Sequence, residues 1–240
     1  MQPISQFRRH LFAALLSGAG LLLTTPVVSA APNNIPQLAL TKSTTSLAMA
    51  AAQRDLAQFV AHQLQRQGAP ADFPLDVADL RDLKDAKISY GFAVHTIDPP
   101  DLLAGRQTMQ AMAKNIGQWR FVITLNQRPI GLATVEKNNG RYETVAYGAA
   151  VLAKDLDAMA AAYGNADKSN LRFVRIFQAR SDLLEVTGQD GTARFAPLHS
   201  ARASLSLAKD NNDGKNGLMD ESEFMQPLRT AVKQNMAASQ

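Results

Sequence analysis

The chain of 240 residues contains no cysteine. A disulfide, a lipid-modified cysteine and a thiolate metal site are therefore all excluded. The folded state must be stabilised by packing or by bound metal. Because 46% of the residues are apolar, the chain can bury a full core, which favours one globular domain with a tail over two independent domains.

The sequence also has little excess of charge. It contains 25 basic and 21 acidic residues. Removing the first thirty residues takes away Arg8 and Arg9 but no acid, which leaves 23 basic against 21 acidic residues and a net charge of +2. Charges this nearly balanced give little reason to expect nucleic acid or an anionic membrane as a partner.

No apolar run is long enough to cross a membrane. The longest lies over residues 11–23 and is shorter than the ~18 residues that a spanning helix needs. Arg8 and Arg9 precede it, and Pro26 and the small residues 28–30 follow it, which is the layout of a secretory signal peptide. We expect cleavage after Ala30 and a periplasmic or secreted protein. The adjacent arginines also resemble the twin-arginine export signal, but we favour the Sec-type signal because such pairs are common there.

Catalytic motifs are missing from the sequence as well. It has no Gly-x-Ser-x-Gly elbow, no phosphate-cradling glycine loop, no dinucleotide fingerprint and no His-Glu-x-x-His pair. We expect the three histidines of the mature chain to be structural or exposed: His62, His95 and His199. Glu136 and Glu143 flank a predicted hairpin, where paired carboxylates more often form a polar rim than a catalytic pair. Scattered catalytic groups stay possible, so we leave the enzyme question open and favour a non-enzymatic protein.

Apolar periodicity predicts two long helices. Met49, Leu56 and Leu64 belong to one apolar stripe that we expect to begin near Leu47, after a flexible linker over residues 31–46. A second amphipathic helix is expected over residues 152–163. Residues 102–116 could line a further helix, and residues 198–208 fit a helix or a strand equally well.

The strand signals lie between these helices. Residues 87–97 are rich in β-branched and aromatic side chains. Apolar and polar residues alternate over 119–125, and the segments 130–137 and 141–147 follow it across short turns, the second of which is Asn139-Gly140. Further strands are expected over 171–179, 183–187 and 192–196. Because strands joined by such short turns pair antiparallel, the sequence predicts an α+β fold, an antiparallel meander sheet with helices packed on one face. We assign this domain to residues 47–200 and a loop-helix segment to residues 201–240.

Near the carboxyl end, residues 209–224 gather carboxylates, side-chain amides and glycines into one short loop. Ca²⁺ is bound by this mixture of oxygen ligands on a sharply turning backbone. The segment resembles an EF-hand calcium loop with an insertion, and the resemblance covers about fifteen residues. It implies a Ca²⁺ site with these candidate ligands, among which Asp213 is a substitute: Asp210, Asn212, Asp213, Asn216, Asp220 and Glu223.

The same residues also fit an interpretation without metal. Asp220 and Glu223 have the spacing of a helix capping box, which would begin a helix through Phe224, Leu228 and Val232. An Asn-, Asp- and Gly-rich turn before such a helix needs no cation. If a cation does bind, a single loop without a paired partner indicates a structural site of modest affinity, typically ~10⁻⁴ to 10⁻³ M.

Three functional hypotheses follow from the sequence. The one we favour is an exported calcium-binding module of a bacterial-type envelope, which binds a protein or a small ligand and uses Ca²⁺ to order its carboxyl-terminal segment. The second is a hydrolase, or an inhibitor or pro-segment of one, in which His95 or His199 meets a carboxylate. The third is a metal-free structural domain of the envelope.

Overall fold

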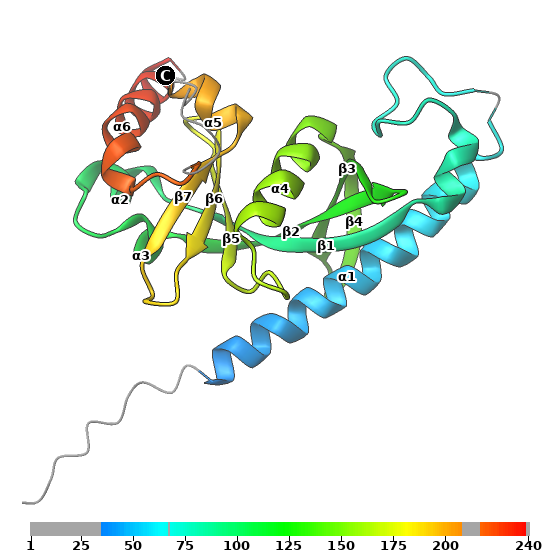
Figure 1. Cartoon of the computed structure of the whole chain (residues 1–240), viewed down its shortest axis with the longest axis horizontal. Helices are drawn as coiled ribbons and strands as arrows, with labels where there is room; N and C mark the ends of the chain where they lie inside the picture. Colours follow the sequence, from blue (N-terminus) through cyan, green and yellow to red (C-terminus); the bar gives the residue numbers. More distant parts are fainter. Residues whose placement is uncertain (1–34, 67, 208–216, 239–240) are drawn as a thin grey trace, which may run out of the picture.

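A seven-stranded sheet forms the centre of the protein in the computed structural model, which describes residues 35–66, 68–207 and 217–238 (Figure 1). The strand order is β4-β3-β2-β1-β5-β6-β7. The predicted signal peptide lies outside the described residues. The α+β class is confirmed. The strands are β1 (Lys87–Thr96), β2 (Lys114–Leu125), β3 (Arg128–Asn138), β4 (Arg141–Gly148), β5 (Leu171–Ile176), β6 (Ser181–Thr187) and β7 (Ala193–Pro197).

The sheet consists of two antiparallel halves. The predicted meander is present as β2-β3-β4, to which β1 adds antiparallel, while β5, β6 and β7 form a second meander. The halves meet where β1 and β5 run parallel, with only two Cα pairs, Val94 with Phe173 and His95 with Val174. A parallel pair needs a long crossover, and here the chain returns from β4 through a helix before it enters β5.

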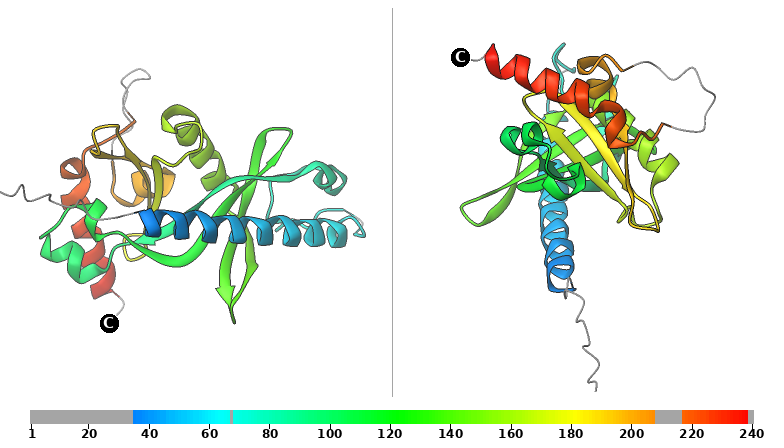
Figure 2. Two further views of the ribbon diagram at one scale, coloured as in Figure 1. Left: turned by 90° about the horizontal axis from the view of Figure 1, so that it is seen from below. Right: turned by 90° about the vertical axis from the view of Figure 1, so that its left-hand side faces the viewer.

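The helices cover both faces of the sheet, so the expectation of helices on one face is corrected. Figure 1 shows α1 on one side of the strands and α4 on the other, and Figure 2 shows α1 lying across β1 to β4. The side chains of a strand point alternately to the two faces of the sheet, and β2 carries buried apolar residues on both faces. Each face therefore needs a helix to cover it. The helices are α1 (Ile35–Gln63), α2 (Pro99–Ala104), α3 (Met109–Met112), α4 (Ala150–Tyr163), α5 (His199–Ser204), α6 (Glu221–Ala237) and the 3₁₀ helix η1 (Leu80–Asp85).

Three clusters of buried side chains result. The first joins α1 to one face of β2 and β3 through Trp119, Phe121 and Ile123. The second joins α4 to the opposite face, which carries Val122 and Leu132. The third joins α2, α3 and α6 to β5 and β6, and its members include Val174, Ile176, Leu183, Phe224, Leu228 and Val232.

Two segments differ from the expected secondary structure. Helix α1 begins at Ile35 rather than near Leu47, so most of the segment assigned to a linker is helical. Residues 38–40 and Lys42 favour helix, but five serines and threonines follow between residues 41 and 46 and the segment has no apolar stripe, which is why periodicity did not detect it. Residues 102–116 contain the end of α2, all of α3 and the start of β2 instead of one helix, because Gly105 ends α2 with a positive φ of 61°.

The carboxyl-terminal helix begins as the metal-free interpretation predicted. Asp220 is the N-cap residue of α6, and Glu223 completes a capping box by accepting a hydrogen bond from the backbone N–H of Asp220 at 2.6 Å. In the part of the segment 198–208 that is described, residues 198–207, the chain forms the short helix α5 and no strand. Since Phe224, Leu228 and Val232 are fully buried against β5 and β6, α6 belongs to the core of the sheet domain.

In the described part of the chain, no helix has both the length and the apolar character required to span a bilayer.

Candidate functional site

A cleft opens where β1 and β5 separate beyond their two paired residues. Its volume is about 640 Å³. The sheet splits here because β1 has irregularities of register between Ile88 and Gly91 and between Ala93 and His95, and such bulges bend a strand. The lining residues come from α1, β1, α3, β5, β6 and the segment before β5: Thr45, Ser46, Met49, Tyr90, Gly91, Phe92, Ala93, His95, Gln110, Asp167, Lys168, Ser169, Asn170, Leu171, Arg172, Glu185 and Thr187.

Gly91 lets β1 lie very close to β2 at the wall of this cleft. A Cβ atom at position 91 would lie 2.2 Å from Cδ1 of Phe121 and 2.6 Å from the backbone oxygen of Arg120. Both atoms belong to β2, and the backbone oxygen cannot move aside as a flexible side chain can. Only glycine fits this position, and the close contact holds β1 against β2 on the side away from β5.

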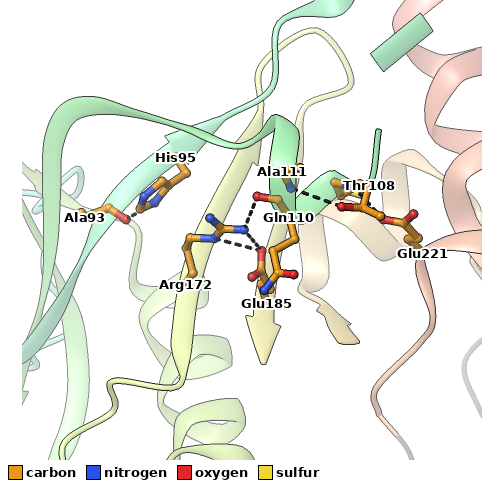
Figure 3. A network of polar contacts seen from close by, with 9 residues as sticks. Ala93, His95, Thr108, Gln110, Ala111, Arg172, Glu185 and Glu221 are labelled. Carbon is orange, nitrogen blue, oxygen red and sulfur yellow. Dashed lines mark hydrogen bonds and ion pairs between the residues drawn. The ribbon is translucent and has the colours of Figure 1, made fainter. Parts of the chain in front are cut away.

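A buried ion pair lies at the inner end of the cleft. Arg172 of β5 donates from Nε to Oε2 of Glu185 on β6 at 2.9 Å, and its Nη2 also contacts that carboxylate and donates to the backbone oxygen of Gln110 at 2.9 Å. Glu185 is only 2% exposed. Figure 3 shows Arg172 extending toward Glu185 and Gln110. Because both charges are satisfied within the protein, this end of the cleft is polar but internally neutral.

The pKa of Glu185 reflects two opposed influences. Burial raises the pKa of this carboxyl, while the hydrogen bonds and the charge of Arg172 lower it. The charge of Glu221 raises it further. The net direction is upward, so Glu185 depends on Arg172 to remain ionised.

His95 lies on the other side of Arg172 in Figure 3. Its Nδ1 is 3.2 Å from the backbone oxygen of Ala93. Burial, and secondly the charge of Arg172, lower the pKa of His95, so the ring is neutral at pH 7. At His199, the backbone N–H donates to Asp155 at 2.6 Å. Within the residues described, no hydrogen bond joins either histidine ring to a carboxylate.

The other polar groups of the cleft are also engaged. The Tyr90 hydroxyl donates to Asp157 at 3.0 Å, and burial and that carboxylate raise the pKa of Tyr90. Lys168 donates from Nζ to the backbone oxygen of Ala160 at 2.9 Å. The lining carries two cations, Lys168 and Arg172, and two carboxylates, Asp167 and Glu185, so its charges balance. The cleft therefore suits a polar ligand without net charge, bound by hydrogen bonds and by contact with apolar lining residues.

Glu221 connects this network to the carboxyl-terminal helix. Its Oε2 accepts a hydrogen bond from the backbone N–H of Met109 at 2.7 Å. Met109 is the first residue of α3, and the next residue, Gln110, supplies the oxygen that Arg172 contacts. The first turn of α6 is therefore joined through α3 to the wall of the cleft (Figure 3).

Of the six candidate calcium ligands, the structure places two. Asp220 and Glu223 are engaged in the capping box, and Oδ1 of Asp220 lies 3.4 Å from Nε of Arg194. The other four, Asp210, Asn212, Asp213 and Asn216, lie outside the described residues. Over the described ranges, which omit residues 208–216, no three His, Asp or Glu side chains gather as a metal site would require.

The predicted carboxylate pair lies at the tip of the meander. Glu136 of β3 and Glu143 of β4 are cross-strand partners, and Glu136 accepts a hydrogen bond from Gln118 at 2.7 Å. They are not part of the cleft, so their position agrees with a polar rim.

Sequence reasoning missed four residues of the network, namely Gln110, Arg172, Glu185 and Glu221. One signal was present, because Glu185 interrupts the apolar run 183–186 in a segment expected to be a strand. A charged residue in such a run has to be paired inside the protein or lie at an edge.

Comparison of the chain with family models, with curated proteins and with solved structures yields no match.

Proposed function

We propose that the protein is an exported, non-enzymatic binding module. It takes an uncharged polar ligand, or a segment of another protein, in the cleft between β1 and β5. The loop at residues 210–223 binds Ca²⁺ through Asp210, Asn212, Asp213, Asn216, Asp220 and Glu223, and the ion orders the carboxyl-terminal segment.

The observation that carries this proposal is the hydrogen bond between Glu221 and Met109. Glu221 follows Asp220 directly in the sequence, so an ion that binds this loop acts next to the residue that supports α3. Through Gln110, α3 contacts the ion pair of Arg172 and Glu185. Ca²⁺ binding in the loop is thereby linked, through α3, to the wall of the cleft.

Anchored residues after the loop also support it. The backbone N–H of Gly217 donates to the Tyr163 hydroxyl at 3.0 Å, and Met219 pairs with Phe195 through two backbone hydrogen bonds of 2.7 and 2.9 Å. The last two candidate ligands therefore begin from a fixed position. A site whose ligands are partly preorganised loses less conformational entropy when the cation binds.

The test of the calcium site is a pair of melting curves for the chain without residues 1–30, in millimolar CaCl₂ and in chelator. Ca²⁺ is expected to raise the Tm, because an ion that binds only the folded state stabilises it. Asp210→Asn and Asp213→Asn should each reduce the rise, while the exposed control Asp72→Asn should keep it. If neither Tm nor titration calorimetry responds to millimolar Ca²⁺, the calcium part of the proposal is wrong.

The cleft is tested separately, with the His95 ring as the reporter in NMR spectra. A panel of uncharged sugars and amino-acid amides is titrated, and a bound compound should shift the His95 signals in a saturable way. Thr187→Trp fills the cleft and should abolish the shift, whereas Thr230→Trp, at an exposed position on α6, should not. A shift that survives Thr187→Trp would place the ligand elsewhere.

A further inference from the structure

Two arginines of different strands share the sheet face opposite the ion pair of the cleft. Arg120 of β2 alternates with Val122, and Arg175 of β5 alternates with Phe173, so all four point to the face covered by α4. The Arg120 guanidinium lies over the Phe173 ring, 5.3 Å from its centroid. Neither arginine belongs to the lining of the cleft.

In the described part of the chain, one carboxylate, that of Asp182, lies beside the two guanidinium groups. Nη1 of Arg175 lies 3.3 Å from Oδ1 of Asp182, and Oδ2 of Asp182 accepts a hydrogen bond from the Ser200 hydroxyl at 2.9 Å. Asp182 is buried, with 4% of its surface exposed. Among the residues that the structure describes, two cations thus share one carboxylate, and one positive charge there has no counterion in a partly buried place.

Some N–H groups of these two arginines also lack a hydrogen-bond acceptor among the described residues. In the described part of the chain, Nε and Nη1 of Arg120 and Nε of Arg175 are buried and lack a hydrogen-bond partner. Leaving buried N–H groups of a cation unsatisfied is costly, and the cost is higher when a second cation is near. Burial, and secondly the charge of Arg175, lower the pKa of Arg120, which agrees with this arrangement.

We propose that Arg120 and Arg175 form a binding site for an oxyanion, the carboxylate or phosphate group of a small ligand. The guanidinium fork presents parallel N–H donors that match the oxygens of either group. A bound oxyanion would satisfy the free N–H groups and supply the missing negative charge. The cation–π contact of Arg120 with Phe173 restricts the position of its guanidinium group in advance, so less side-chain freedom is lost when the anion binds.

The experiment compares Tm values of the chain without residues 1–30 in sodium chloride, sodium phosphate and sodium acetate at equal ionic strength. The site predicts a saturable rise of several degrees in one of the two oxyanions over chloride. A rise in phosphate alone indicates a phosphate ligand, and a rise in acetate alone indicates a carboxylate ligand. Titration calorimetry with the more effective anion should then show one site per chain.

Arg120→Gln removes the unpaired charge and should weaken the affinity for the anion at least tenfold. Arg141→Gln, at an exposed position of β4, is the matched control and should leave the affinity unchanged. If Arg120→Gln does not fold, Arg175→Gln and Arg120→Lys replace it, and both should lose affinity. Equal Tm values in all three salts, or an anion effect unchanged by these variants, would overturn the proposal and assign the free N–H groups to water.

Discussion

The carboxylate of Glu221 accepts a hydrogen bond of 2.7 Å from the backbone N–H of Met109, a residue 112 positions earlier in the chain. The bond joins the first turn of α6 to the first turn of α3. An ionised acceptor for a backbone N–H that has no partner within its own helix makes a strong, charge-assisted hydrogen bond. It is also the contact through which the carboxyl-terminal segment reaches the cleft.

Replacing Glu221 should therefore destabilise the protein beyond the loss of a surface side chain. We expect Glu221→Ala to lower the free energy of unfolding by about 1–3 kcal/mol, since a backbone N–H loses a charged acceptor. Glu221→Gln keeps an acceptor and should cost less. Urea denaturation gives these values, with the exposed Ser222→Ala as the control. If the alanine variant is as stable as the control, the contact contributes nothing.

The ion pair of Arg172 and Glu185 should show strong coupling in a double-mutant cycle. Glu185→Leu leaves Arg172 without its carboxylate, and breaking a buried pair in this way costs about 3–5 kcal/mol. The double variant Arg172→Met with Glu185→Leu removes both charges and should recover most of that loss. Urea denaturation of the four proteins measures the coupling. Additive effects of the two single changes would mean that the charges act independently.

His95 should make the stability depend on pH below neutrality. Burial and Arg172 lower its pKa in the folded state, whereas in the unfolded chain it takes up a proton near pH ~6.5. Above that pH both states are neutral and the contribution of His95 is fully present. As the pH falls from ~6.5 toward the folded pKa, the unfolded state binds more protons, so stability decreases.

The measurement is the free energy of unfolding at a series of pH values from ~7.5 to ~5. His95→Gln should flatten this profile in the upper part of the range, while His62→Gln, at an exposed position on α1, should not change it. The His95 variant would disprove the assignment if it loses stability on acidification as steeply as the unchanged protein does.

The local parts of this fold could be predicted from the sequence. Alternation over residues 119–125 and the Asn139-Gly140 turn were enough for the meander, because neighbouring strands and a two-residue turn determine each other. The same holds for the capping box of Asp220 and Glu223, whose members are three residues apart. Both features depend on residues that are close in the sequence, so they can be predicted without the rest of the chain.

The cleft could not be predicted in this way, because it depends on long-range pairing. The cleft lies where β1 and β5 pair at two residues and then separate. Neither segment has a sequence feature that identifies the other as its neighbouring strand. Arg172 and Glu185 become partners through the antiparallel register of β5 and β6, which a one-residue slip would abolish. The contact of Glu221 with Met109 likewise joins two segments that only the folded core brings together.

Helix α6, which the sequence analysis assigned to a separate segment, packs into the core of the sheet domain, and its removal from that core should be costly. Phe224 is fully buried and meets Phe195 of β7 edge to face, with ring centroids 5.6 Å apart. Phe224→Ala should cost about 3–5 kcal/mol through lost burial and the cavity left behind. Met236→Ala, at an exposed position of the same helix, should stay within about 0.5 kcal/mol of the unchanged protein.

The fluorescence of Trp119 shows whether the Phe224→Ala substitution affects the whole domain. It is the only tryptophan of the chain and lies in the cluster beneath α1, in the other half of the sheet. If the sheet unfolds as one cooperative unit, Phe224→Ala must shift the fluorescence transition of Trp119 to lower urea by as much as it shifts the helical signal in circular dichroism. If the helical signal moves while the Trp119 transition stays in place, the two halves of the sheet unfold separately, and the short parallel contact of β1 with β5 is where they divide.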